Sequence, residues 1–160
     1  MGKSKTIYSI YSCCFVFSVH PRYKHDVGYR LSRSGLAIAY GQKVEFQGPL
    51  VDNVVYASGG QTINITYRAV SSIELRNSNG FEVCCQGSKC ANDNDHSWIP
   101  STVTNKNDLT ITIAVNSSCV SKQLYGVRYL WRDTPCLFKQ AAVYSGTDAN
   151  LPSPPYIKVF

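Results

Sequence analysis

The chain has 160 residues, a formal net charge of +6 and only 16% charged residues. A chain of this length can bury one hydrophobic core, and its positive charge is scattered from Lys3 to Lys158 without a recognised nucleic-acid-binding motif, so no nucleic-acid partner is expected. The 11 tyrosines, together with many valines, isoleucines and threonines, favour β structure.

Residues 1–18 differ in character from the rest of the chain. The sequence MGKSKT precedes an uncharged run from Ile7 to Val19, which is the order found in a signal peptide. This run is shorter than the roughly 20 residues that span a bilayer, so membrane insertion is not expected. The start also fits the myristoylation pattern at Gly2, with Cys13 or Cys14 as a second acylation site. Our preferred interpretation is a divergent or truncated start joined to a folded piece.

The stretch from Val19 to Gly41 places a histidine at the entrance of a predicted helix. His20 precedes a proline, and the residue before a proline is pushed to extended geometry, so His20 is expected on a loop. Apolar residues recur near helical spacing over residues 23–40, and Gly41 is a natural helix stop. The expected apolar face consists of Val27, Leu31 and Ile38. Without further partners, this face either docks on the β region or remains partly exposed.

Other polar residues of this helix have simpler interpretations than catalysis. His25 could assist His20, but at the start of a helix it is expected to be solvated. Asp26 is expected to favour the helix N-terminus through the helix dipole rather than to orient His20. Arg30 and Arg33 are interpreted as part of a solvated face.

From residue 42 onward, short β-rich runs alternate with turn residues. The predicted strands are Asn53–Ala57, Thr62–Tyr67, Ser72–Arg76, Phe81–Cys84, Leu109–Val115 and Tyr125–Trp131. Turns at residues 58–60 and 77–80 are expected to form hairpins. The spacing predicts a β-sandwich, and the proline-rich residues 151–155 predict an extended tail that packs back as an edge segment.

Two tryptophans and two arginines stand out in the β region. Trp98 and Trp131 could stack on a sugar, although a buried aromatic anchor is the commoner role within strands. Arg128 and Arg132 lie in the run GVRYLWRD and are expected to share one face, which packs toward a neighbouring domain or solvent.

Cysteines and sequons indicate an oxidising compartment. The β region contains Cys84, Cys85, Cys90, Cys119 and Cys136, together with N-glycosylation sequons at Asn64 and Asn116. One or two disulfides are expected, with the pairing left open. A metal site built from the first three cysteines and His96 lacks C-x-x-C spacing, and residues 92–95 lack the rest of an EF-hand. No metal or cofactor is therefore expected.

Several motifs carry a family resemblance. HPRYK, VGYRL, AIAYG and FQGPL, in this order from His20, resemble the end of the catalytic domain of the sialate O-acetylesterases, which are esterases of the SGNH-hydrolase type. GVRYLWRDTPC and LPSPPYIKVF resemble the C-terminal end of that family. The resemblance implies that residues 19–41 complete an α/β esterase domain and that residues 42–160 form a C-terminal β-sandwich domain.

The same resemblance implies a chemistry and a location. It implies a secreted or lysosomal protein that hydrolyses O-acetyl esters of sialic acids, with His20 as the general base for a serine nucleophile. The family's serine lies far upstream of this histidine, Phe17 occupies the position of the orienting acid, and no G-x-S-x-G motif occurs in the chain. The chain is therefore expected to be a C-terminal fragment that is inactive alone.

Two alternative interpretations of the sequence remain open. The chain could be a non-catalytic β-sandwich module that binds carbohydrate or another protein, or a lipid-anchored or secreted interaction module that uses residues 1–19. The sequence leaves the oligomeric state open.

Overall fold

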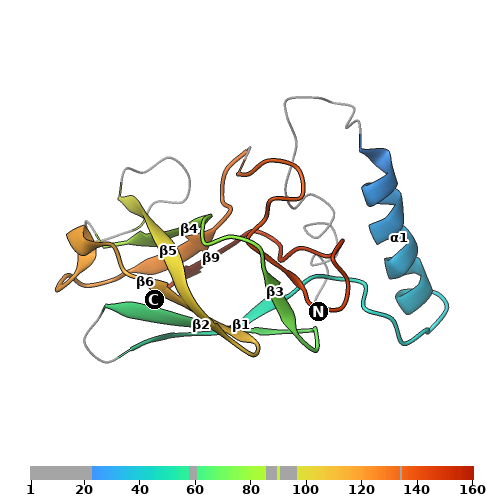
Figure 1. The fold of residues 1–160 in the computed structure, drawn as a ribbon, viewed down its shortest axis with the longest axis horizontal. Helices are drawn as coiled ribbons and strands as arrows, with labels where there is room; N and C mark the ends of the chain where they lie inside the picture. Colours follow the sequence, from blue (N-terminus) through green and yellow to red (C-terminus); the bar gives the residue numbers. More distant parts are fainter. Residues whose placement is uncertain (1–22, 58–60, 86–89, 91–96, 134) are drawn as a thin grey trace.

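The computed structural model describes residues 23–57, 61–85, 90, 97–133 and 135–160 (Figure 1). The elements in chain order are α1 (Lys24–Ile38), β1 (Leu50–Tyr56), β2 (Thr62–Arg68), β3 (Ile73–Leu75), β4 (Phe81–Cys84), β5 (Trp98–Asn107), β6 (Thr110–Ala114), the 3-10 helix η1 (Ser117–Cys119), β7 (Gly126–Tyr129), β8 (Val143–Ser145) and β9 (Tyr156–Val159). Residues 1–18 and His20 lie outside the described residues. Within the described part of the chain, no helix is long and apolar enough to cross a membrane.

Seven strands form one antiparallel sheet in the order β1-β2-β6-β5-β4-β7-β9, and β3 pairs with β8 in a separate ribbon. Strand β5 joins the two halves of the large sheet, since residues 98–101 pair with β4 and residues 102–107 pair with β6. The sheet curls until its edge strands approach one another, and the rings of Tyr56 and Phe160 meet edge-on at 4.6 Å. The mainly β prediction is confirmed, and the sandwich takes the form of one sheet folded over its own core.

The core follows from the alternation of apolar and polar residues along β2 and β6. Ile63 and Ile65 on β2 and Ile111 and Ile113 on β6 are fully buried, while the polar residues between them point outward. Tyr67, Tyr129 and Tyr144 fill the remaining space as the largest fully buried side chains. The high tyrosine content is thus partly explained by packing.

Some strand predictions were wrong in their details. Strand β5 was not predicted, because its sequence WIPSTVTNKN is polar and contains Pro100. The hairpin expected at residues 77–80 does not form, since β3 pairs with β8 and β4 pairs with β5 and β7. The packed-back tail is confirmed, because β9 adds to β7 as an edge strand.

Helix α1 ends as predicted but turns an unexpected face to the sheet domain. Gly41 has φ +66°, and the N–H of Gln42 donates to the Leu36 carbonyl at 3.0 Å. The buried residues of the helix are Asp26 and Arg30, whereas Leu31 and Ile38 are 51% and 63% exposed. Of the two alternatives expected for the apolar face, partial exposure is the one that the structure shows, because polar side chains make most of the contact with the β domain.

After the helix, residues 39–49 lead the chain back to the sheet. A Cβ atom at Gly48 would lie 1.9 Å from the carbonyl oxygen of Pro152, so only glycine allows this close backbone approach. Figure 1 shows α1 standing at one end of the molecule, beside the last loops of the chain.

Candidate functional site

His20 lies outside the described residues, and the first described element that follows it in sequence is α1, which begins at Lys24. We use the name helix clamp for the polar residues that fix α1 and the segment after it to the β domain. The helix clamp consists of Asp26, Tyr29, Arg30, Arg33, Glu45, Lys139, Ser145, Thr147, Asp148 and Asn150.

Three contacts hold the first turns of the helix. The Asp26 carboxylate lies 2.9 Å from Nζ of Lys139, which forms an ion pair in the first helical turn. The Tyr29 hydroxyl donates to Oδ2 of Asp148 at 2.6 Å. Nε of Arg30 donates to the carbonyl oxygen of Asn150 at 2.9 Å. Residues three and four positions apart share one face of a helix, so the polar side of α1 meets Lys139 before β8 and the loop after β8.

Two further residues, Arg33 and Tyr23, fix the ends of the contact surface. Nε of Arg33 donates to the carbonyl oxygen of Glu45 at 2.8 Å and lies 3.7 Å from Oδ2 of Asp148. At the other end, the ring of Tyr23 stacks on Phe138 with centroids 3.8 Å apart. The interpretation of Arg30 and Arg33 as a solvated face was wrong, because both side chains turn toward the β domain.

Glu45 ties the segment after the helix to β8. Its Oε2 accepts hydrogen bonds at 2.6 Å from the hydroxyls of both Ser145 and Thr147. The N–H of Ser71 donates to Oε1 at 3.4 Å. Burial alone would raise the pKa of the Glu45 carboxyl, but these three hydrogen bonds outweigh it and hold the pKa below its usual value. The carboxylate is therefore the form that the fold stabilises.

Burial makes these contacts stronger than ordinary surface ion pairs. The side chains of Asp26 and Asp148 are only 12% and 10% exposed. Hydrogen bonds to charged groups contribute about 1.5–3 kcal/mol, whereas exposed pairs contribute about 0–1 kcal/mol. The helix clamp can therefore hold α1 in place without an apolar interface. Local sequence patterns gave no signal for it, because Tyr29 and Asp148 are 119 positions apart.

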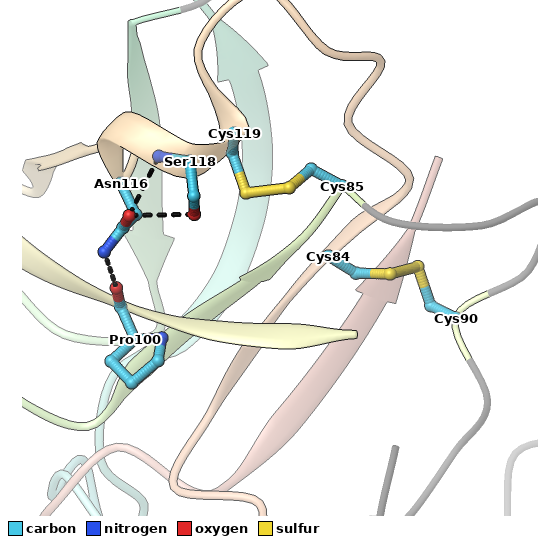
Figure 2. The surroundings of a disulfide bond; sticks show 7 residues. All are labelled: Cys84, Cys85, Cys90, Pro100, Asn116, Ser118 and Cys119. Carbon is cyan, nitrogen blue, oxygen red and sulfur yellow. Dashed lines mark hydrogen bonds between the residues drawn. A yellow bond between two sulfur atoms is a disulfide. The ribbon is translucent and has the colours of Figure 1, made fainter. Parts of the chain in front are cut away.

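Disulfides stabilise another part of the β domain (Figure 2). Cys84 is bonded to Cys90, and Cys85 is bonded to Cys119 across 34 positions of sequence. A disulfide that closes a loop of this size stabilises the folded protein by roughly 3–4.7 kcal/mol, because it restricts the unfolded chain. Cys136 is also disulfide-bonded. The expectation of disulfides is confirmed, and the thiols of the alternative metal site are used in these bonds, while His96 lies outside the described residues.

The sequon of Asn116 lies beside the second disulfide, as Figure 2 shows. Asn116 caps η1, and its Oδ1 accepts from the N–H and the hydroxyl of Ser118 at 3.0 and 2.9 Å. Its Nδ2 donates to the carbonyl oxygen of Pro100 at 3.3 Å. The Asn64 side chain is partly exposed on β2, where its Oδ1 accepts from the Thr112 hydroxyl at 2.8 Å.

The fold is similar to that of a carbohydrate acetylesterase from Xanthomonas citri, with a TM-score of 0.67 and 22% sequence identity. The similarity covers 88% of this chain and 29% of that chain. The same β-rich fold therefore forms one region of the longer Xanthomonas citri protein. The family model described as sialate O-acetylesterase C-terminal domain matches residues 52–160. The chain belongs to this family.

Relatives with a known name agree with this assignment. The sialate O-acetylesterase of Mus musculus is 35% identical over 142 residues, which cover 88% of this chain and 25% of that protein. The sialate O-acetylesterase of Homo sapiens is 32% identical with the same coverage. The chain thus spans about a quarter of the length of these relatives.

Replacing Asp148 with alanine should loosen the helix without unfolding the sheet. The change removes the acceptor of Tyr29 and the anionic partner of Arg33, and a loss of about 1.4 kcal/mol corresponds to a tenfold change in an equilibrium constant. Amide hydrogen exchange in α1 should become roughly 10-fold faster or more, with exchange in β2 and β6 unchanged. Asp52→Ala is the matched control, because Asp52 lies on β1 and forms an exposed ion pair with Arg68 of β2. Equal exchange in α1 for both variants would contradict the clamp.

Replacing Glu45 with glutamine should change the pH dependence of stability. The folded protein holds the pKa of Glu45 below 4.5, so this carboxylate stabilises the fold fully above that value. The contribution is lost as the pH falls through the lowered pKa. Thermal melting from about pH 6 to about pH 3 should show the largest gap between wild type and Glu45→Gln at the upper end. Thr147→Val removes one donor and should give a smaller gap; a gap that widens toward acid would contradict the assignment.

Proposed function

We propose that this chain is the C-terminal part of a sialate O-acetylesterase and that His20 is its general base. The observation that carries the proposal is the family match over residues 52–160, together with similarity to named sialate O-acetylesterases over 88% of the chain. In this proposal residues 19–41 complete the esterase domain, and residues 42–160 are its C-terminal β domain. The helix clamp supports the proposal, because it fixes the helix that directly follows His20.

The chemistry assigned to His20 is proton transfer during ester cleavage. Its neutral imidazole takes the proton of a serine hydroxyl as the serine oxygen attacks the acetyl carbonyl carbon. The proton then passes to the sugar oxygen as the ester bond breaks, and an acetyl-serine remains. Water, deprotonated by the same imidazole, releases acetate and restores the serine. In the proposed enzyme, the serine and the oxyanion donors lie in the part of the family's sequence that is upstream of this histidine.

The disulfides support a secreted or lysosomal location, because such bonds persist in oxidising compartments. O-acetylated sialic acid is the proposed substrate, since the named relatives are sialate O-acetylesterases. The proposal requires no cofactor.

A chimera tests the role of His20 directly. Residues 20–160 of this chain replace the matching region of the mouse sialate O-acetylesterase, and release of acetate from O-acetylated sialic acid is measured. The chimera should be active, and His20→Ala should lower kcat about 10²–10⁴-fold. His25→Ala is the matched control and should retain activity, because His25 is exposed on the first turn of α1. An active His20→Ala chimera would show that another residue is the base.

We also propose that Asn64 and Asn116 carry N-linked glycans. Both side chains are partly exposed, and in both the Oδ1 atom accepts hydrogen bonds. Nδ2 of Asn116 also donates to the Pro100 carbonyl, and a glycosylated amide nitrogen retains one N–H for such a bond. In protein secreted from cultured cells, Asn64→Gln and Asn116→Gln should each remove the mass of one glycan. Asn105→Gln changes an exposed asparagine outside any sequon and should leave the glycan mass unchanged. Secreted protein whose mass is unaffected by peptide N-glycosidase would refute the assignment.

A further inference from the structure

A pocket of about 280 Å³ lies where β4, the start of β5 and the segment after β7 meet. Its lining includes Glu82, Pro100, Leu130, Trp131, Arg132 and Pro135. The pocket therefore combines an aromatic ring, a guanidinium and a carboxylate with apolar walls. Small-molecule sites typically have this composition, in which a few polar groups fix the orientation of the ligand. The helix clamp shares no residue with it.

The charges of the pocket are built into the sheet. The Glu82 side chain is 8% exposed and accepts a hydrogen bond from Nε of the buried Arg128 at 2.7 Å. Its other oxygen is paired with Nη2 of Arg132. Burial raises the pKa of Glu82, but hydrogen bonds from Arg128 and Arg132 outweigh it and keep the carboxyl ionised. Two guanidinium groups thus face one carboxylate, and these three residues carry one net positive charge.

Arg132 is the member of this group that a ligand can reach. Its side chain is 62% exposed, whereas that of Arg128 is 4% exposed. The expectation that Arg128 faces a neighbour or solvent was therefore wrong, and only Arg132 does so. A guanidinium has five N–H donors in a rigid fork that matches a carboxylate. The pairing with Glu82 holds Arg132 in place and leaves donors that can bind an anion.

The two tryptophans have different roles. Trp98 is 5% exposed, and the guanidinium of Arg128 lies over its ring at 4.7 Å, so it is a buried anchor, as expected. Trp131 is only partly buried and lines the pocket. An aromatic ring that lines a pocket offers an apolar face for a sugar ring.

The backbone before these residues is strained. Leu130 has φ +48°, an uncommon conformation for a branched side chain, and its N–H donates to the Gly80 carbonyl at 2.9 Å. Gly80 has φ +90°, and a Cβ there would lie 2.7 Å from Cδ2 of Leu130. Such strain is concentrated at ligand sites, and here it occurs immediately before Trp131 and Arg132.

We propose that this pocket binds the carboxylate-bearing sugar of a glycan, with Arg132 on the carboxylate and Trp131 against the ring. The choice of an acidic sugar rests on the proposed function, since sialic acids carry a carboxylate. The described residues that line the pocket include neither a serine nor a histidine, so the pocket would hold a sialylated glycan without reacting with it.

Titration of the purified 160-residue chain with α2,3-sialyllactose, followed by nuclear magnetic resonance, tests the proposal. Shifts should concentrate on Trp131 and Arg132, and lactose, which lacks the carboxylate, should bind at least about 10-fold more weakly. Arg132→Gln should weaken binding of sialyllactose by a similar factor, and Arg132→Lys should have a smaller effect because it keeps the charge. Arg68→Gln is the matched control, since it alters an exposed ion-paired arginine at the end of β2.

The outcomes separate this proposal from the proposed function. Equal binding of lactose and sialyllactose, no effect of Arg132→Gln, or no shift at millimolar ligand would overturn the pocket assignment. An inactive esterase chimera with intact, Arg132-dependent binding would overturn the esterase proposal and leave the pocket. If the Arg132→Gln chain fails to fold, the comparison of lactose with sialyllactose and the Arg132→Lys variant still test the pocket assignment.

Discussion

The placement of the helix depends on carboxylates held by hydroxyl and guanidinium donors at one end of the β domain. Asp148 receives the Tyr29 hydroxyl and the Arg33 guanidinium, and Glu45 receives the hydroxyls of Ser145 and Thr147. Ser145 belongs to β8, which pairs with β3 and also bonds to the tail through Leu151. Directional contacts of this kind fix a position and an orientation more strictly than apolar contacts do.

This arrangement explains why the apolar side of α1 faces away from the β domain. Leu31, Ile38 and Tyr40 are all more than half exposed. A helix normally buries its apolar stripe and solvates its polar side, and here the described residues do the reverse. The proposed function accounts for the reversal, because a helix that completes an esterase domain needs a polar side for one neighbour and an apolar side for the other.

Local sequence patterns predicted the structural features that depend on residues close together in the sequence. The alternation along β2 and β6, the end of α1 at Gly41 and the packed-back tail all followed from spacing and backbone preference. Strand β5 could not be predicted, since its partners and not its composition make it a strand. The helix clamp and the pocket both join residues far apart in sequence, such as Glu82 and Arg132. Tryptophan and arginine were visible as candidates, but only the fold distinguishes buried Trp98 from accessible Trp131.

The two ends of the molecule are stabilised by different chemistry. Near η1, the Cys85–Cys119 disulfide joins the end of β4 to the 3-10 helix, so this end depends on an oxidising environment. At α1, the helix clamp depends on ionised carboxylates. The hydrogen bonds that lower the pKa of Glu45 keep its carboxylate ionised in mildly acidic surroundings as well as at neutral pH. The first device therefore depends on the redox state of the surroundings, and the second depends on their pH.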